Sequence, residues 1–196
     1  MHLQAFENQC PEPGQKHCHN PEIHGGEKVL EEPLLLVDGA AVSVYDINQG
    51  EDNDYYMNHT FEGTVNSSGA IIMDYRDDKY LKDWNTFIYG HNMKNGSMFG
   101  SLKKLLDDET LYDSDPYIYV YLPGYIYRYK IFSYYKDKPD SKMYWTADTL
   151  QEYRQYIRDA LSLSVRDLGV ETSVDNLTVG FTGYMNRRGH AERDAK

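Results

Sequence analysis

Residues 117–132 read YIYVYLPGYIYRYKIF, and this stretch decides the fold class. Its first part alternates tyrosine with isoleucine and valine, which is the period of a strand with two chemically different faces. Pro123 and Gly124 form a turn signal, so the stretch predicts an antiparallel hairpin with strands over 117–121 and 125–132. We therefore expect a domain that is mainly β.

Further strands are predicted on both sides of this hairpin. The run AIIMDY at 70–75 follows a turn cluster, NSSG, at 66–69. A second run, TFIY at 86–89, stops at Gly90, and a last run, LTVGF, covers 177–181. Short β-rich runs divided by turn residues are typical of sandwiches and barrels.

One long helix is predicted between the late strands. Apolar residues recur there at spacings of three and four, namely Leu150, Tyr153, Ile157, Ala160 and Leu161. The motif TLQE at 149–152 fits a capping box, and Gly169 is a plausible stop, so we expect a helix over about 149–167. With short helical turns near 97–106, the pattern predicts a closed or partly open β-barrel with helical insertions.

Composition excludes several classes of partner. The chain has 196 residues, and 31 Asp and Glu against 20 Lys and Arg give a formal net charge of −11. This acidic balance argues against nucleic acid and anionic membranes, which bind basic surfaces. The longest clean apolar run, LLLV at 34–37, is far shorter than the roughly 20 residues of a membrane span. We therefore expect this chain to be soluble, without a membrane anchor of its own.

The first 33 residues differ in character from the rest. They are rich in proline, histidine and scattered charge without a sustained period, which predicts a poorly ordered tail over 1–33 before a barrel domain over 34–196. Cys10 and Cys18 lie in this tail. Their spacing does not match the tight pair of a zinc site, so two free thiols or an incidental disulfide are favoured over metal binding. The sequence implies neither a metal nor an organic cofactor.

The stretch NTFIYGHNMKNGSMFGSL at 85–102 carries the most chemical information. Its histidine, His91, is expected just past the end of a strand, where Gly90 would let the backbone turn sharply. A single histidine there could be a surface-loop residue or an acid–base group.

The wider string resembles the class B sortases, cysteine transpeptidases that attach proteins to Gram-positive cell walls. That family has a Tyr-Gly-His-Asn-Met segment followed by Gly-Ser-Met-Phe-Gly, and this chain has YGHNM at 89–93 and GSMFG at 96–100. The resemblance also covers QGEDNDYYMNH at 49–59 and GAIIMDYR at 69–76, and it extends over roughly 38–188. Several specific segments in the same order are a stronger signal than one short motif.

The resemblance implies a reaction and a set of site residues. In sortases a cysteine thiolate attacks the threonine carbonyl of a sorting signal, and an amine then resolves the thioacyl-enzyme. His91 takes the position of the family's acid–base histidine, and Arg188, next to Arg187, the position of the arginine that steadies the substrate and the oxyanion. Positions that line the family's substrate groove correspond to Asn53, Met57 and Tyr89, although these could be ordinary turn and packing residues.

The implied partners and location follow from the same family. They are a surface protein bearing a sorting signal as the peptide substrate, and a peptidoglycan amine or a pilin lysine as the acceptor. The implied location is the extracellular face of a bacterial membrane.

Both ends of the chain depart from the family pattern. Near the start, the tryptophan-containing entry strand expected of the family is poorly matched around 34–46. Sortases carry the nucleophile in Thr-Leu-Ser-Thr-Cys, whereas residues 177–184 read LTVGFTGY. Thr182 occupies the nucleophile position, or Phe181 if one counts back from the arginine, and neither is a thiol. A polar segment, GHAERDAK at 189–196, stands where the family has an apolar strand, which predicts an exposed barrel edge.

Three functions are compatible with the sequence. The first is a class B sortase-like transpeptidase, for which we expect very little turnover without the thiol. The second is a catalytically inactive sortase-fold protein that at most binds sorting-signal peptides. The third is a tyrosine-rich binding module for sugars or peptides built on 117–129, although these tyrosines equally suit the wall of a barrel.

Overall fold

The computed structural model describes residues 2–8, 34–37, 43–114, 116–122, 125–137, 143–174 and 177–184. Its strands form a closed barrel in the order β1-β7-β6-β2-β3-β4-β5-β8. Their bounds are β1 His2–Asn8, β2 Leu34–Val37, β3 Ser43–Asn48, β4 Ile71–Met73, β5 Asn85–His91, β6 Tyr117–Leu122, β7 Tyr125–Tyr135 and β8 Thr178–Tyr184. Two neighbouring pairs, β3 with β4 and β5 with β8, are parallel, and the other pairs are antiparallel. The prediction of a mainly β barrel is confirmed.

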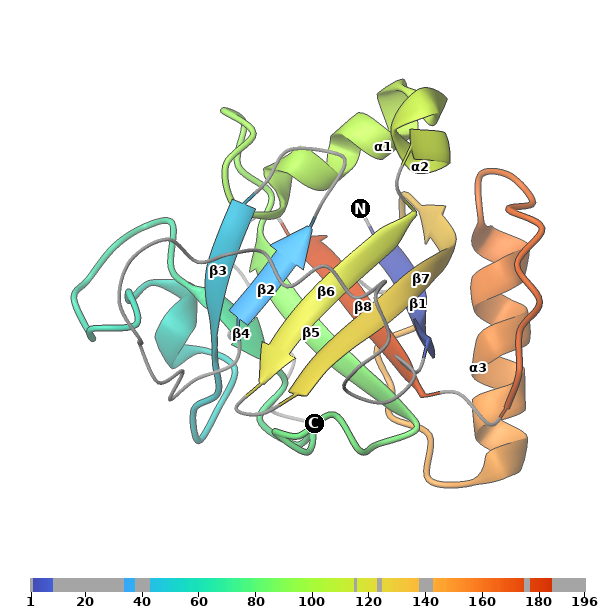
Figure 1. Ribbon diagram of the computed structural model, residues 1–196. Coiled ribbons are helices and arrows are strands. Elements are labelled where there is room, and N and C mark those ends of the chain that lie inside the picture. The colour runs from blue at the N-terminus through green and yellow to red at the C-terminus, as the bar shows by residue number, and fades with distance from the viewer. Residues whose placement is uncertain are drawn as a thin grey trace.

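Helices cover one end and one side of the barrel (Figure 1). The short helices η2 (Phe99–Lys103), α1 (Lys104–Asp107) and α2 (Glu109–Ser114) follow β5, and α1 and α2 lie together at one end. The long helix α3 (Leu150–Leu163) runs alongside the wall. A single 3-10 turn, η1 (Tyr55–Met57), lies in the loop between β3 and β4.

The hydrophobic core has two parts, separated by the barrel wall. The inner cluster fills the barrel and includes Ile88 and Phe181. The outer cluster lies between the wall and α3 and includes Phe87 and Tyr156. Because residues of a strand alternate between faces, odd-numbered residues of β5 face outward and even-numbered ones face inward.

The predicted hairpin supplies β6 and β7. Ile118, Val120 and Leu122 are buried in the inner cluster, whereas the tyrosines that alternate with them in β6 are only partly buried. Tyr129 of β7 is fully buried in the same inner cluster. The tyrosines of this hairpin thus contribute to the barrel wall on both of its sides.

The first strand differs from the sequence prediction. The predicted tail included His2–Asn8, but these residues form β1, antiparallel to both β7 and β8. Gln4 and Ala5 are fully buried, and the Tyr156 hydroxyl donates to Gln4 Oε1 over 2.6 Å. The predicted open edge is therefore wrong, because β1 lies between the two strands that would have been left unpaired. Residues 9–33, including Cys10 and Cys18, lie outside the described part of the chain.

Helix α3 confirms the predicted helix and its start. Thr149 and Glu152 form the expected capping box, and Tyr153, Ile157 and Ala160 are buried. The helix ends at Leu163, four residues before the predicted end. The chain leaves it there because the Val165 N–H donates to the carbonyl of Tyr134 in β7 over 3.0 Å.

Candidate active site

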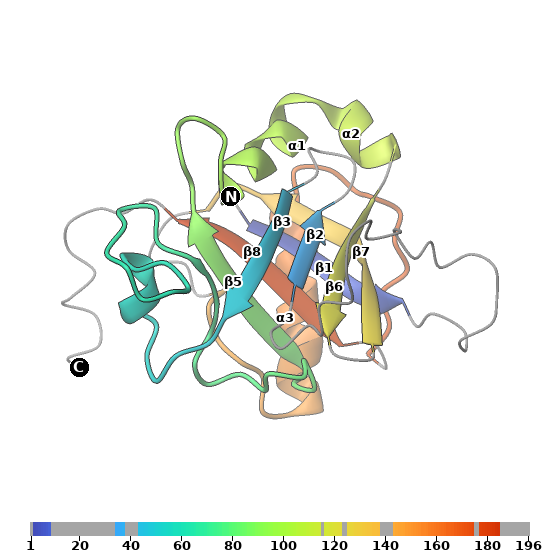
Figure 2. The ribbon, with the colours of Figure 1, turned by 60° about the vertical axis from the view of Figure 1, so that its left-hand side comes forward.

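The C-terminal ends of β5 and β8 lie side by side in the barrel wall (Figure 2). In this parallel pair Tyr89 is opposite Thr182, and His91 is opposite Tyr184. Tyr89, His91 and Thr182 therefore belong to the outward face of the wall. A strand spacing of about 4.8 Å and a rise of about 3.3 Å per residue put the Cα atoms of His91 and Thr182 about 8 Å apart. The structure thus brings the predicted histidine close to the predicted nucleophile position.

Strand β5 continues through Gly90 and ends at His91, whereas the sequence analysis placed His91 beyond the strand end. Gly90 is not among the glycines of positive φ, so it does not make a sharp turn. A Cβ at this inward-facing position would collide with Ile71 Cδ1 and the ring of Phe99. Packing therefore requires a glycine at position 90. His91 is the last residue of β5 and is held in the sheet.

The His91 ring is buried, with 3% of the residue exposed, and one of its nitrogens is fixed by η1. Nε2 lies 2.8 Å from the carbonyl oxygen of Met57. A carbonyl oxygen only accepts, so Nε2 is the donor, and a neutral ring then has its lone pair on Nδ1. The predicted groove residue Met57 thus contacts the predicted acid–base residue, through its backbone.

The other two predicted groove residues meet at a carboxylate that the sequence analysis did not select. Asp74 follows β4, and its Oδ2 accepts hydrogen bonds from Asn53 Nδ2 (3.1 Å) and from the hydroxyl of Tyr89 (3.0 Å). Arg76 forms a salt bridge with the same oxygen at 2.7 Å. The signal in the sequence was an aspartate directly after an apolar strand and two residues before an arginine.

A second buried carboxyl group, Asp77, lies close to Asp74, whose backbone carbonyl accepts the Asp77 N–H over 3.0 Å. It accepts a hydrogen bond from the backbone N–H of Phe87 in β5 over 2.6 Å and another from Thr146 Oγ1 over 3.2 Å. Burial raises the pKa of Asp77 to about 7. The hydrogen bond from the Phe87 N–H lowers this pKa, whereas the negative charges of Asp74 and Asp83 raise it. The residue ties the segment 143–147 to the outer face of β5.

The remaining predicted residues are placed in part. Thr182 is buried, with 2% exposed, in β8. Arg188 lies outside the described residues, so its predicted role stays a prediction. Within the described ranges, His, Cys, Asp and Glu side chains do not gather in any group that could hold a metal ion.

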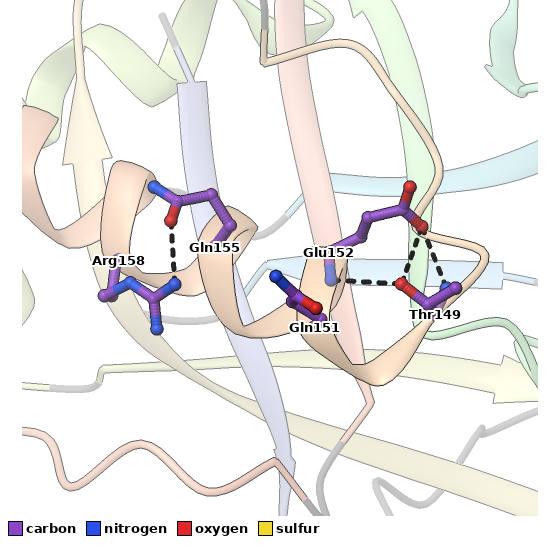
Figure 3. Close-up of a pocket in the computed structure, with 5 residues that line it drawn as sticks. All are labelled: Thr149, Gln151, Glu152, Gln155 and Arg158. Carbon is purple, nitrogen blue, oxygen red and sulfur yellow. Dashed lines mark hydrogen bonds between the residues drawn. The ribbon is translucent and has the colours of Figure 1, made fainter.

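A surface depression of about 440 Å³ lies elsewhere (Figure 3). It is lined by exposed residues of α3 and its N-cap, namely Thr149, Gln151, Glu152, Gln155 and Arg158. None of these residues contacts the carboxylates or the histidine described above through a hydrogen bond among the described residues. The candidate site is therefore defined by the ends of β5 and β8 and not by this depression.

Comparison with known proteins agrees with the geometry. A family model described as the sortase domain matches residues 42–164. The chain belongs to the sortase family. It is 49% identical to sortase B of Listeria monocytogenes over 67 residues, which are 34% of this chain and 27% of that protein. It is 26% identical to sortase B of Staphylococcus aureus over 162 residues, which are 82% of this chain and 66% of that protein.

The solved structure of Listeria monocytogenes sortase B shares this fold. Its TM-score with this chain is 0.71 at 30% identity, and the match covers 78% of this chain and 87% of that one. The predicted resemblance to class B sortases is thus confirmed. The aligned segments span 27% and 66% of the lengths of the two curated relatives. Among the described residues of this sortase-family chain, the helices are all too short or too polar to cross a bilayer.

Proposed function

We propose that this chain carries sortase-type transpeptidase chemistry at the C-terminal ends of β5 and β8. The substrate would be a C-terminal sorting signal cleaved after threonine, and the acceptor an amine of the cell wall, at the extracellular face of a bacterial membrane. The observation that supports the proposal is the parallel pairing of β5 with β8, which leaves the Cα atoms of the buried His91 and of Thr182, the proposed nucleophile position, about 8 Å apart.

The arrangement suits acyl transfer in two steps. The nucleophile at 182 gives its proton to the His91 ring and adds to the substrate carbonyl, the peptide C–N bond breaks, and the leaving amine takes that proton from the ring. The acceptor amine then forms the new C–N bond and gives a proton to the ring, the bond to the enzyme nucleophile breaks, and the nucleophile takes this proton back. Arg188 is proposed to stabilise the oxyanion of both steps, as a guanidinium that stays charged at any working pH.

Residue 182 determines how fast this chain can react. A thiol is nucleophilic near neutral pH, whereas the hydroxyl of threonine needs a strong and well-placed base. We therefore expect the native chain to bind a sorting-signal peptide and to cleave it very slowly.

The test replaces the hydroxyl by a thiol. Thr182→Cys is incubated with a panel of peptides that each carry a candidate sorting signal, and intact-mass spectrometry is used to look for a thioacyl adduct. We expect an adduct in this variant and none in the matched variant Thr182→Ser. Adding His91→Ala to Thr182→Cys should lower the rate of adduct formation by roughly a hundredfold or more, the usual contribution of acid–base catalysis.

Two outcomes would contradict the proposal. One is a folded Thr182→Cys variant, verified by circular dichroism, that forms no adduct with any peptide of the panel. The other is adduct formation that is indifferent to His91→Ala. Isothermal titration calorimetry of the native chain tests the second function. Peptide binding by the native chain and by Thr182→Cys, without turnover in either, would identify a sortase fold that only recognises the peptide.

A further inference from the structure

The carboxylate of Asp74 is the centre of the polar contacts at the candidate site. Its side chain is fully buried, and it accepts five hydrogen bonds. Arg76 supplies three of them, from its backbone N–H (3.1 Å), Nε (2.8 Å) and Nη2 (2.7 Å). Asn53 and Tyr89 supply the other two.

These two donors come from separate parts of the chain. Asn53 lies in the loop that precedes η1, and Tyr89 lies in β5, two residues before His91 and opposite Thr182. Asn53 is fixed a second time, because its Oδ1 accepts the backbone N–H of Tyr75 over 3.0 Å. One carboxylate oxygen thus joins the loop, the end of β4 and the reactive end of β5.

We propose that Asp74 is a positioning residue of the active site, which holds the side chains of Asn53 and Tyr89 in place for the peptide substrate. This inference rests on the proposed function. It adds a residue that contacts neither the nucleophile position nor the histidine through any described hydrogen bond. Because the Tyr89 hydroxyl donates its hydrogen bond to Asp74, the phenol oxygen of Tyr89 can only accept hydrogen bonds from a ligand.

The negative charge of Asp74 contributes to this positioning. A buried carboxylate stays ionised only when it is paired and hydrogen-bonded. Burial raises the pKa of Asp74, but the hydrogen bonds and positive charge of Arg76 outweigh it, and the pKa lies below its usual value. An amide at this position would keep the shape but lose the ion pair. Its NH₂ group would face either the two Arg76 donors at Oδ1 or the donors of Arg76, Asn53 and Tyr89 at Oδ2.

The first measurement reads the position of Asn53 directly. In ¹⁵N-labelled protein, the side-chain amide signals of Asn53 are assigned by their loss in Asn53→Ala. Asp74→Asn is expected to shift these signals and to abolish their protection from exchange. The matched control is Asp77→Asn, which replaces another buried carboxyl group that has no described hydrogen bond to Asn53 or Tyr89, and it should leave the signals in place.

The second measurement reads peptide binding. Asp74→Asn should weaken the peptide Kd by roughly tenfold, about the effect of one lost hydrogen bond to a charged group. Tyr89→Phe should weaken it in the native background but by less than about twofold in the Asp74→Asn background, because residues that act as a unit are non-additive. A merely structural role of Asp74 would give effects that multiply.

The results separate the two proposals. Unchanged Asn53 signals in folded Asp74→Asn, or multiplying effects on Kd, would overturn the role of Asp74. If the native chain binds no peptide while Asp74→Asn still releases the Asn53 amide, the geometric part of the inference stands and the proposed function fails.

Discussion

The side chain of His91 is oriented by a backbone atom. The Met57 carbonyl accepts from Nε2, so a neutral ring exchanges protons through Nδ1. Since Met57 closes the 3-10 turn η1, whose backbone is held by the bond from Met57 N–H to the Asp54 carbonyl, the loop fixes both the tautomer and the tilt of the ring. A change in the loop is therefore expected to affect proton transfer as well as peptide binding.

A pH effect on stability is predicted for Asp77. Its pKa is about 7 in the folded protein, while an unfolded aspartate titrates near 3.9. Between these values the folded state binds more protons than the unfolded state, so the free energy of unfolding falls as pH rises from about 4 to 7. Asp77→Asn removes this titration. As pH rises from 5 to 8, the free energy of unfolding of this variant should therefore increase relative to that of the native chain by at least about 1 kcal/mol.

Urea denaturation at the two pH values checks this prediction. The control is Asp52→Asn, an exposed carboxylate whose pKa is lowered by the backbone N–H groups of Tyr55 and Asp54. That group titrates below the tested window, so its replacement should not change the slope. Parallel stability–pH curves for the native chain and Asp77→Asn would contradict the prediction.

At the residue scale, the predicted site residues were chosen because they belong to recognisable strings. His91 and the groove positions Asn53, Met57 and Tyr89 are found together around the ends of β4 and β5. Asp74 was not selected, because only its contacts in the fold distinguish it from other carboxylates. Its partners Asn53, in a loop, and Tyr89, in β5, are 21 and 15 residues away in sequence. The same holds for Asp77.

At the scale of elements, the start of α3 is set by local chemistry. Thr149 Oγ1 accepts the Glu152 N–H over 3.2 Å, and Glu152 Oε2 accepts the Thr149 N–H over 3.0 Å (Figure 3). Both bonds satisfy backbone donors that the first turn of a helix leaves unpaired.

Removing this cap should destabilise the protein. Thr149→Ala is expected to lower the free energy of unfolding by about 1 kcal/mol, the usual value for an N-cap threonine. Gln151→Ala, in the same exposed turn, is the control and should stay within about 0.5 kcal/mol of the native chain. Equal effects of the two substitutions in denaturant titrations would refute the assignment of the cap.

The ends of elements were predicted less well than their existence. The helix stops early because the Val165 N–H donates to the Tyr134 carbonyl, and β5 continues because Gly90 and His91 pair with Gly183 and Tyr184 of β8. Both causes are contacts between distant segments, which the periodicity of one segment does not contain. The predicted hairpin and the capping box were right, because each depends on neighbours in sequence.

At the scale of the whole molecule, the barrel is closed by a segment that was not predicted to be a strand. The run HLQAFEN is short, and only the edges of β7 and β8 make it a strand. Its Gln4 also accepts the hydroxyl of Tyr156 from α3, so β1 joins the wall to the helix.

Deletion of residues 1–8 is expected to lower the thermal transition and to cause self-association, because it opens the edges of β7 and β8. Differential scanning fluorimetry and light scattering would measure both effects. The milder variant Gln4→Ala leaves the buried Tyr156 hydroxyl without its acceptor and should lower stability by about 1–3 kcal/mol while the protein stays monomeric. A deletion variant as stable and monodisperse as the native chain would show that β1 does not close the barrel.

The register of β1 has a practical consequence for anyone who handles this protein. His2 is paired with Thr182, so the amino end of the strand lies at the very position where acyl transfer is proposed. An affinity tag fused ahead of His2 would emerge there and compete with incoming peptide. A cargo sequence tethered at the same point through a flexible linker would instead be delivered to residue 182 at high local concentration.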